Sequence, residues 1–213
     1  MGKVQAVVFD FGETLVNETR MWETVAKVSG VPFFTLAGVL GAGIERRTPH
    51  RAVFDELGIA PIEPFQHGYV LGLDDFYPDG IEALTRLHAR GLRLGIAGNQ
   101  PSGVVEQLSV LGLPLDLIAS SSTLGVSKPD PRFFEQIVTH LNLSPNEIVY
   151  VGDRLDNDVL PALSLGMHAV FIKRGPWGYI HSSWPQAHRV QHTITSLAEI
   201  EDIIDRIEAD DRT

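Results

Sequence analysis

Residues 4–15 read VQAVVFDFGETL, an apolar run that ends at Asp10 and continues into a glycine-containing loop. The run predicts a buried β-strand, because its hydrophobic residues are nearly continuous instead of alternating with polar ones. A carboxylate at the end of such a strand is unfavourable unless a cation lies close to it. The segment therefore predicts that Asp10 has a cationic partner elsewhere in the chain.

Four further apolar runs resemble the first and are bounded by turn residues. They lie at residues 92–97, 116–120, 147–151 and 168–172. Helical patterns separate them, at residues 79–91, 102–112 and 130–141, and a last helix opens at residues 196–199. Asp130 with Pro131 is typical of a helix start, and Ser196 with Glu199 has capping-box spacing. This alternation predicts an α/β fold with a doubly wound parallel sheet, a Rossmann-like core.

Residues 17–78 interrupt the alternation. The stretches MWETVAKVSG and PHRAVFDELG look helical, and no convincing strand lies between them. We therefore expect a catalytic core at residues 1–16 and 79–213 with a small helical cap at residues 17–78. Two connections between these parts permit hinge closure. The stretch 174–188, rich in proline and glycine, is expected to be a loop on the edge of the core or part of a dimer contact.

Composition restricts the function. The chain has 213 residues, a formal net charge of −10 and no cysteine. The negative charge disfavours a nucleic-acid binder, and the lack of cysteine excludes thiolate chemistry, disulfides and cysteine-based zinc sites. No apolar run approaches the length of a membrane span and no signal-peptide pattern is present, so the expected location is cytoplasmic. Positive charge for an anionic substrate must be local.

Polar residues follow three of the predicted strands. Asp10 follows the first, Gly98 and Asn99 the second, and Asp153 the fourth, while Lys128 lies on a proline-flanked turn in GVSKPDP. Ligands of open parallel sheets bind outside the carboxyl ends of the strands. We therefore expect these residues to meet at one edge, where an ammonium group lies among carboxylates.

Four motifs together resemble those of the haloacid dehalogenase superfamily of hydrolases. They are VVFDFGETL, GIAGNQ, SKPDP and YVGDRLDND, and the resemblance covers the whole chain. The insert is similar to the small helical cap of that family. The resemblance implies that the first and fourth strands are neighbours, which would bring Asp10 next to Asp153.

The resemblance also implies roles for individual residues. Asp10 would be the nucleophile, already ionised at neutral pH, and Lys128 would hold it beside the phosphoryl oxygens. Mg²⁺ would be held by Asp10, the carbonyl of Gly12 and Asp153, hard oxygen ligands for a hard cation. Asp158 would support either the metal or Lys128. Asp156 and Asn157 would do the same or cap the following helix.

Phosphate binding is expected from the loop amides around Gly12 and Glu13 and from Gly98 and Asn99, and two of these positions depart from the family pattern. Gly12 stands where most phosphatases of the family carry the aspartate that protonates the leaving group. Glu13 is the nearest substitute, although a shift of one residue points it elsewhere; water or the substrate could also serve. Gly98 replaces the usual serine or threonine.

The resemblance favours a Mg²⁺-dependent hydrolase of a small phosphorylated metabolite, acting through an aspartyl-phosphate as a monomer or homodimer. One alternative is a weak or inactive relative retained as a binding or assembly module, because two catalytic side chains are missing. Another is a haloacid dehalogenase, which needs no metal. The acidic fourth motif, VGDRLDND, disfavours this second alternative.

Overall fold

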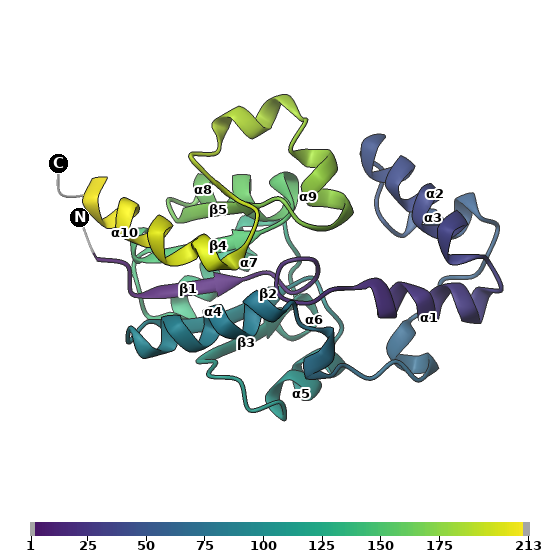
Figure 1. Cartoon of the computed structure of the whole chain (residues 1–213), viewed down its shortest axis with the longest axis horizontal. Coiled ribbons are helices and arrows are strands. Elements are labelled where there is room, and N and C mark those ends of the chain that lie inside the picture. The colour runs from purple at the N-terminus through teal and green to yellow at the C-terminus, as the bar shows by residue number, and fades with distance from the viewer. Residues whose placement is uncertain (1–2, 211–213) are drawn as a thin grey trace.

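The computed structural model describes residues 3–210, so the outermost ends of the expected core, residues 1–2 and 211–213, lie outside the described part. A six-stranded sheet forms its centre, in the order β3-β2-β1-β4-β5-β6 (Figure 1). Every strand pair is parallel. The strands are β1 (Ala6–Phe9), β2 (Arg93–Gly98), β3 (Leu117–Ser120), β4 (Ile148–Gly152), β5 (His168–Ile172) and β6 (His192–Ile194). The sequence predicted the first five, and β6 is an addition.

Helices cover both faces of the sheet, which confirms the doubly wound fold. The helices that follow the insertion are α4 (Pro78–Ala89), α5 (Ser102–Ser109), α6 (Ser121–Leu124), α7 (Pro131–Leu141), α8 (Leu160–Ser164), α9 (Gly175–His181) and α10 (Ile200–Asp210). Side chains of α4, α5 and α10 pack with Val7 and Phe9 of β1 on one face. Those of α7 and α8 pack with Ala6 and Val8 on the other.

Two helix starts agree with their sequence signals. The Asp130 carboxylate accepts a hydrogen bond from the backbone N–H of Arg132 at the start of α7. Ser196 and Glu199 form a capping box in the short 3₁₀ turn that leads into α10. Local polar side chains therefore satisfy the free backbone groups at these helix ends.

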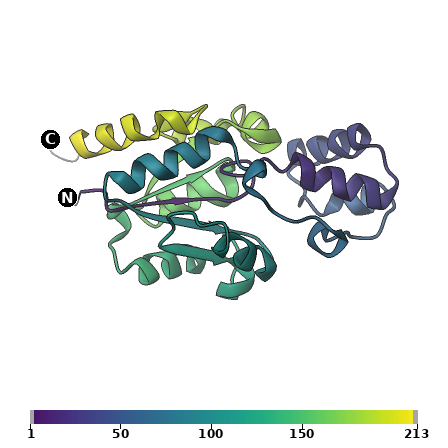
Figure 2. The same cartoon turned by 60° about the horizontal axis from the view of Figure 1, so that its bottom comes forward.

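A helical insertion follows β1, as expected. It contains α1 (Thr19–Ser29), α2 (Phe33–Glu45) and α3 (Ala52–Glu56), and these helices surround an apolar cluster separate from the two sheet faces. Figure 2 shows the insertion beside the end of the core at which β1 terminates. Helix α2 had no counterpart in the sequence analysis, because its three glycines weaken a helical pattern that burial of Leu36, Leu40 and Ile44 supports.

The two connections to the insertion lie side by side. The Asn17 N–H donates to the carbonyl of Asp75, and the Tyr77 N–H donates to that of Leu15, each at 2.8 Å. This pairing is compatible with the hinge inferred from the sequence. The limits 17–78 for the cap stay a prediction.

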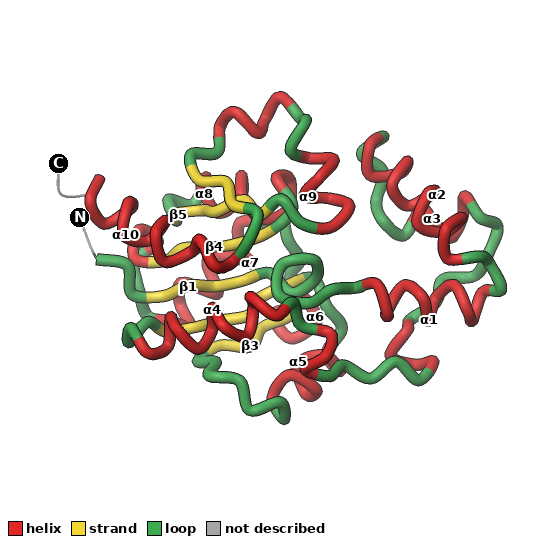
Figure 3. The backbone as a smooth tube through the Cα atoms, viewed as in Figure 1, coloured by secondary structure: helices red, strands yellow, loops and turns green. Residues whose placement is uncertain are grey.

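The expectation of a loop at residues 174–188 was wrong. Helix α9 fills its first half and a 3₁₀ turn at Pro185–Arg189 its second (Figure 3). Pro176 lies in the first turn of α9, where its missing N–H has no partner to lose. Trp177 is buried in the apolar cluster of the insertion, so tertiary packing stabilises a helix that the Gly- and Pro-rich sequence disguises.

No single helix among residues 3–210 is both long and apolar enough to cross a bilayer. Helices α1 and α2 meet the length and composition limits only when taken together, and a bend of 113° separates them.

Candidate active site

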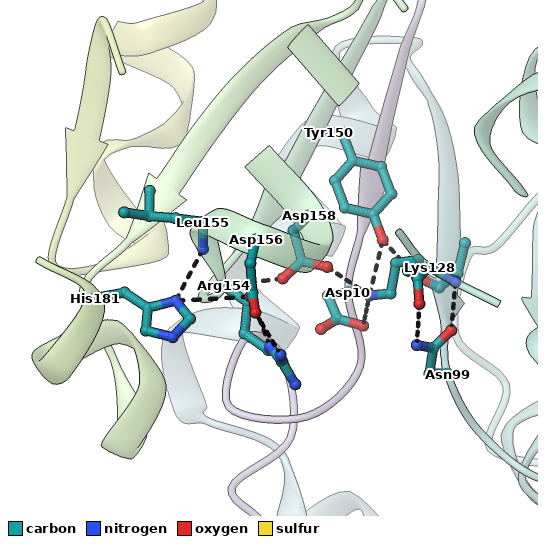
Figure 4. Close-up of polar contacts among 10 residues, drawn as sticks. Asp10, Asn99, Lys128, Tyr150, Arg154, Leu155, Asp156, Asp158 and His181 are labelled. Atoms are coloured by element: carbon teal, nitrogen blue, oxygen red, sulfur yellow. Dashed lines mark hydrogen bonds and ion pairs between the residues drawn. The ribbon is translucent and has the colours of Figure 1, made fainter. Parts of the chain in front are cut away.

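Asp10 lies where β1 ends, and its expected cation is Lys128. The Lys128 Nζ is 2.6 Å from Oδ1 of Asp10 and 2.6 Å from Oδ1 of Asp158 (Figure 4). Burial lowers the pKa of Lys128, but the carboxylates of Asp10 and Asp158 outweigh it and hold the pKa well above the ordinary value. Lys128 is therefore a charged ammonium group in a buried position.

Asn99 fixes the loop that carries Lys128. Its side-chain Nδ2 donates to the Lys128 carbonyl at 2.9 Å, and its Oδ1 accepts from the Lys128 N–H at 2.8 Å. The expected meeting of the second and third motifs therefore occurs through a reciprocal pair of hydrogen bonds. Both polar atoms of the Asn99 side chain are therefore engaged by the backbone of Lys128.

Tyr150 is a site residue that the sequence analysis missed. Its hydroxyl accepts a hydrogen bond from Lys128 Nζ at 3.2 Å and donates to the Ala97 carbonyl at 2.7 Å. The only signal in the sequence is a phenol within an otherwise apolar strand, IVYVG. Tyr150 links β4 to β2 and helps to orient the ammonium group.

Asp153 and Asp158 complete an acidic cluster with Asp10. One carboxylate oxygen from each lies within 4.8 Å of the others, and all three residues are buried. Burial, then repulsion from Asp158 and Asp10, raises the pKa of Asp153 well above its ordinary range. Burial and the charge of Asp10 raise the pKa of Asp158 to about 7 against the opposing effect of Lys128. One ammonium group does not neutralise three carboxylates.

The donor set fits a hard divalent cation. Oδ2 of Asp153 is buried and has no hydrogen-bond partner within residues 3–210. A bound cation would satisfy this oxygen and relieve the repulsion among the carboxylates. Asp158 is already engaged, because its Oδ1 pairs with Lys128 and its Oδ2 accepts from the Arg154 N–H at 3.0 Å.

A comparison with protein families agrees with these motifs. The model of the haloacid dehalogenase-like hydrolases matches residues 4–166, which include Asp10 at the end of β1, Lys128 and the acidic cluster. The chain belongs to this hydrolase family.

Curated relatives of this hydrolase include phosphatases. Glyceraldehyde 3-phosphate phosphatase of Methanocaldococcus jannaschii is 27% identical over 97% of this chain and the whole of that protein. Phosphoserine phosphatase of Thermus thermophilus is 34% identical over a shorter stretch, 46% of this chain and 41% of that protein.

Solved structures share the fold of the hydrolase. A phosphatase of the family from Thermococcus onnurineus superposes with a TM-score of 0.65 at 23% identity, covering 94% of this chain and 98% of that one. A magnesium-bound family member from Bacillus subtilis gives 0.68 at 15% identity, covering 95% and 99%. A defluorinating L-2-haloacid dehalogenase gives 0.66 at 20% identity, covering 96% and 95%. At these identities the likeness establishes the fold alone.

Both carboxylate oxygens of Glu13 accept hydrogen bonds from other residues of the protein. Its Oε1 accepts from the Glu18 N–H at 2.9 Å, and its Oε2 accepts from the Tyr77 hydroxyl at 2.6 Å. Its backbone lies in the left-handed region, with φ of 52°. The side chain therefore braces the loop against the two connections to the insertion.

Glu18 is a second residue that the sequence analysis missed. It lies seven per cent exposed at the start of α1, and its Oε2 accepts from the Trp22 indole N–H at 3.4 Å. Burial, followed by the charges of Glu13 and Asp10, raises the pKa of Glu18 to about 8. No sequence motif indicates that this carboxyl group belongs to the site. It reaches the site only because the chain folds back on itself after the loop that follows β1.

Both glycines that depart from the family pattern lie against acidic side chains. A Cβ on Gly98 would lie 2.7 Å from Oδ1 of Asp10, and a Cβ on Gly12 would lie 2.1 Å from Oε1 of Glu18. Each glycine therefore provides space that a neighbouring carboxyl group occupies. With Asp10 in its present position, a serine or threonine at 98 would not fit.

Asp156 and Asn157 differ in their surroundings. The Asp156 carboxylate accepts from the Arg154 guanidinium at 2.8 and 3.1 Å and lies 3.8 Å from Nδ1 of His181. It does not cap the turn that follows β4, because no side-chain cap forms there. Asn157 lines the cavity at the site.

A cavity of about 220 Å³ lies between the core and the insertion. The core side contributes Asp10, Lys128 and Asp153, whereas the insertion contributes apolar side chains such as Trp22 and Phe54 together with a few charged ones. The core side can bind a charged group, and the apolar side chains of the insertion can cover the rest of a small molecule.

Proposed function

We propose that the protein is a Mg²⁺-dependent phosphatase acting on a small phosphate monoester. The observation that carries this proposal is the paired arrangement of Asp10 and Lys128, 2.6 Å apart, beside the unsatisfied oxygen of Asp153. A carboxylate nucleophile, a fixed cation and an acidic metal site are the parts that phosphoryl transfer requires. The phosphatases among the curated relatives support the same reaction.

The reaction has two steps. A carboxylate oxygen of Asp10 forms a bond to phosphorus as the ester P–O bond breaks, and the bonding electrons remain on the leaving oxygen, which takes up a proton. Water then attacks the aspartyl-phosphate, which releases inorganic phosphate and restores the Asp10 carboxylate. Lys128 holds the nucleophile in position and offsets the charge of the phosphoryl oxygens throughout.

Asp10, the carbonyl of Gly12 and Asp153 would hold the metal, with Asp158 in support. Bound Mg²⁺ would neutralise phosphoryl oxygens and the acidic cluster. The backbone amides of Gly12, Glu13, Gly98 and Asn99 are proposed to bind the phosphoryl group. These amides suit that role because the side chains of Glu13 and Asn99 already have partners within the protein.

The insertion is proposed to act as a cap, at residues 17–78, that closes over the substrate and excludes bulk water. The cavity of about 220 Å³ suits a substrate with few carbon atoms. A small phosphorylated metabolite is therefore the expected partner, in a cytoplasmic protein that is a monomer or homodimer.

The test is turnover of p-nitrophenyl phosphate and glyceraldehyde 3-phosphate with Mg²⁺, with EDTA, and by the Asp10→Asn variant. We expect phosphate release with Mg²⁺, and only the enzyme-free background in the other two assays. Glu63→Gln is the matched control, because Glu63 belongs to the same cavity but is solvated and paired with Arg51. Turnover by Asp10→Asn equal to that of the wild type would refute the proposal.

Two alternatives have their own outcomes. Chloride release from L-2-chloropropionate in EDTA would identify a dehalogenase, a class represented among the structural neighbours. A Mg²⁺-induced rise in Tm without turnover of any phosphate ester would identify a binding module. The acidic cluster disfavours the dehalogenase, because three buried carboxylates have no evident use without a cation.

A further inference from the structure

This inference builds on the proposed phosphatase reaction and concerns the proton that the leaving oxygen needs. An alkoxide is a poor leaving group, so a positioned acid typically contributes about 10²–10⁴-fold to the rate. Five acidic residues line the cavity: Asp10, Glu13, Glu18, Glu63 and Asp153.

Four of them are unsuited to this task. Asp10 is the nucleophile, and Asp153 belongs to the proposed metal site. Both oxygens of Glu13 accept hydrogen bonds from the protein, at 2.9 and 2.6 Å. The side chain of Glu63 is 37% exposed and lies 2.8 Å from an Arg51 guanidinium nitrogen, so it is already engaged in an ion pair.

Glu18 remains, and its position is distinctive. The carboxyl group folds back from the start of α1 onto the nucleophile loop, residues 11–16. There its Oε1, Cδ and Cγ lie 2.1, 2.5 and 3.2 Å from the place of a Cβ on Gly12. The glycine and the glutamate therefore share one space, and any other residue at position 12 would displace Glu18. Trp22 and the loop hold the group in this orientation from the other side, because the indole donates to Oε2 while the Glu18 N–H donates to Glu13.

Within residues 3–210, Oε1 of Glu18 accepts no hydrogen bond, whereas Oε2 does. Oε1 is thus the oxygen left to face a substrate in the cavity that Glu18 and Asp10 both line. We propose that Glu18 occupies the place of the side chain missing at Gly12 and donates the proton to the leaving-group oxygen.

The proton balance closes over both steps. The Glu18 O–H bond breaks as the ester P–O bond breaks, and the proton passes to the leaving oxygen, so that an alcohol departs and Glu18 becomes a carboxylate. In the second step, Glu18 takes a proton from the attacking water as the new P–O bond forms. The carboxyl group is then restored.

The test compares an alkyl ester, glyceraldehyde 3-phosphate, with an aryl ester, p-nitrophenyl phosphate, whose leaving group needs no proton. Glu18→Gln keeps the size of the side chain and removes the acid. We expect kcat/KM to fall by about 10²-fold or more for the alkyl ester and by less than about tenfold for the aryl ester. A merely structural role would reduce both equally, and equal losses or no loss would overturn the proposal.

Matched controls use two other groups in the same cavity. Glu63→Gln and His50→Gln should leave the alkyl-to-aryl ratio of kcat/KM within about threefold of the wild-type ratio, because Glu63 is paired with Arg51 and, within residues 3–210, neither side chain is hydrogen-bonded to residues 10–18. A collapse of the ratio in His50→Gln but not in Glu18→Gln would assign the proton to His50 and overturn the proposal. Retained aryl turnover in Glu18→Gln also separates this outcome from failure of the proposed function, which Asp10→Asn tests.

The shared space allows a second, independent variant. Gly12→Asp alone should impair both substrates, because its Cβ would meet Glu18 at 2.1 Å. Gly12→Asp combined with Glu18→Ala removes the clash and supplies an acid from position 12. We expect this double variant to exceed Glu18→Ala in alkyl-ester turnover by at least about tenfold. A double variant no faster than Glu18→Ala would contradict the exchange of roles between the two positions.

Discussion

The Nζ of Lys128 and the Oδ1 of Asp10 lie 2.6 Å apart in a pair whose side chains are 2% and 11% exposed. Two residues that are far apart in the sequence thus meet at one end of the sheet. Lys128 is therefore the cationic partner that a carboxylate at the end of a buried strand requires. The lysine ammonium group neutralises the carboxylate in a position that little water reaches, and Asp10 still lines the cavity.

Removal of this ammonium group should destabilise the fold as well as the site. Lys128→Met leaves Asp10 and Asp158 without their common cation, so we expect the free energy of unfolding to fall by about 3–5 kcal/mol. Urea denaturation measures the change. Lys27→Met, which alters an exposed lysine of α1, should change it by less than about 0.5 kcal/mol. Equal stability of the two variants would contradict the buried ion pair.

The Tyr150 hydroxyl provides a milder test of the same network. Tyr150→Phe leaves the Ala97 carbonyl and one Lys128 donor without their partner, so the free energy of unfolding should fall by about 1–3 kcal/mol. Tyr179→Phe is the matched control, because Tyr179 is 65% exposed. Thermal or urea unfolding compares the two variants, and a neutral Tyr150→Phe would show that the hydroxyl is dispensable.

Two glycine-to-alanine changes should have opposite signs. A Cβ on Gly152 would lie 2.5 Å from three atoms of Asp158, so Gly152→Ala should displace that carboxylate and lower the free energy of unfolding by about 1–3 kcal/mol. It should also reduce the rise in Tm that we expect on addition of Mg²⁺. Gly38 lies within α2 with nothing within 4 Å of its Cβ position, so Gly38→Ala should stabilise by up to about 1 kcal/mol. Stabilisation by both would contradict the crowding at Asp158.

Glu18 should make stability depend on pH. Its folded-state pKa of about 8 lies above the ordinary value of 4.5, so the folded state binds more protons than the unfolded state between these values. The contribution of Glu18 to the free energy of unfolding should therefore be greatest below about pH 4.5 and should decrease as the pH rises to about 8. Glu18→Gln should remove this component. The slopes of unfolding free energy against pH should then differ by up to about 1.4 kcal/mol per pH unit, and identical slopes would refute the shift.

Much of the fold could be predicted from local patterns. The runs at β1, β2, β4 and β5 are apolar enough to require cover on both faces, and the caps at Asp130 and Ser196 act through neighbours in sequence. The pattern failed at α2 and α9, where glycine and proline mask helices. Those two helices are stabilised by packing against each other, and Trp177 of α9 is buried in the apolar cluster of the insertion. Periodicity cannot report a contact between segments more than a hundred residues apart.

Local patterns in the chain were enough to predict the parallel sheet, the helical insertion and the candidates Asp10, Lys128, Asp153 and Asp158, because strand hydrophobicity and short motifs are local properties. The groups that support these candidates became evident from the three-dimensional packing. The Tyr150 hydroxyl accepts a hydrogen bond from the Lys128 ammonium group, and the Asn99 side chain accepts one from the backbone N–H of Lys128. Glu18 turns back to fill the space beside Gly12. Such contacts depend on how distant backbone segments are placed relative to one another. Close packing of the whole core fixes that placement, and the spacing of residues along the chain does not report it.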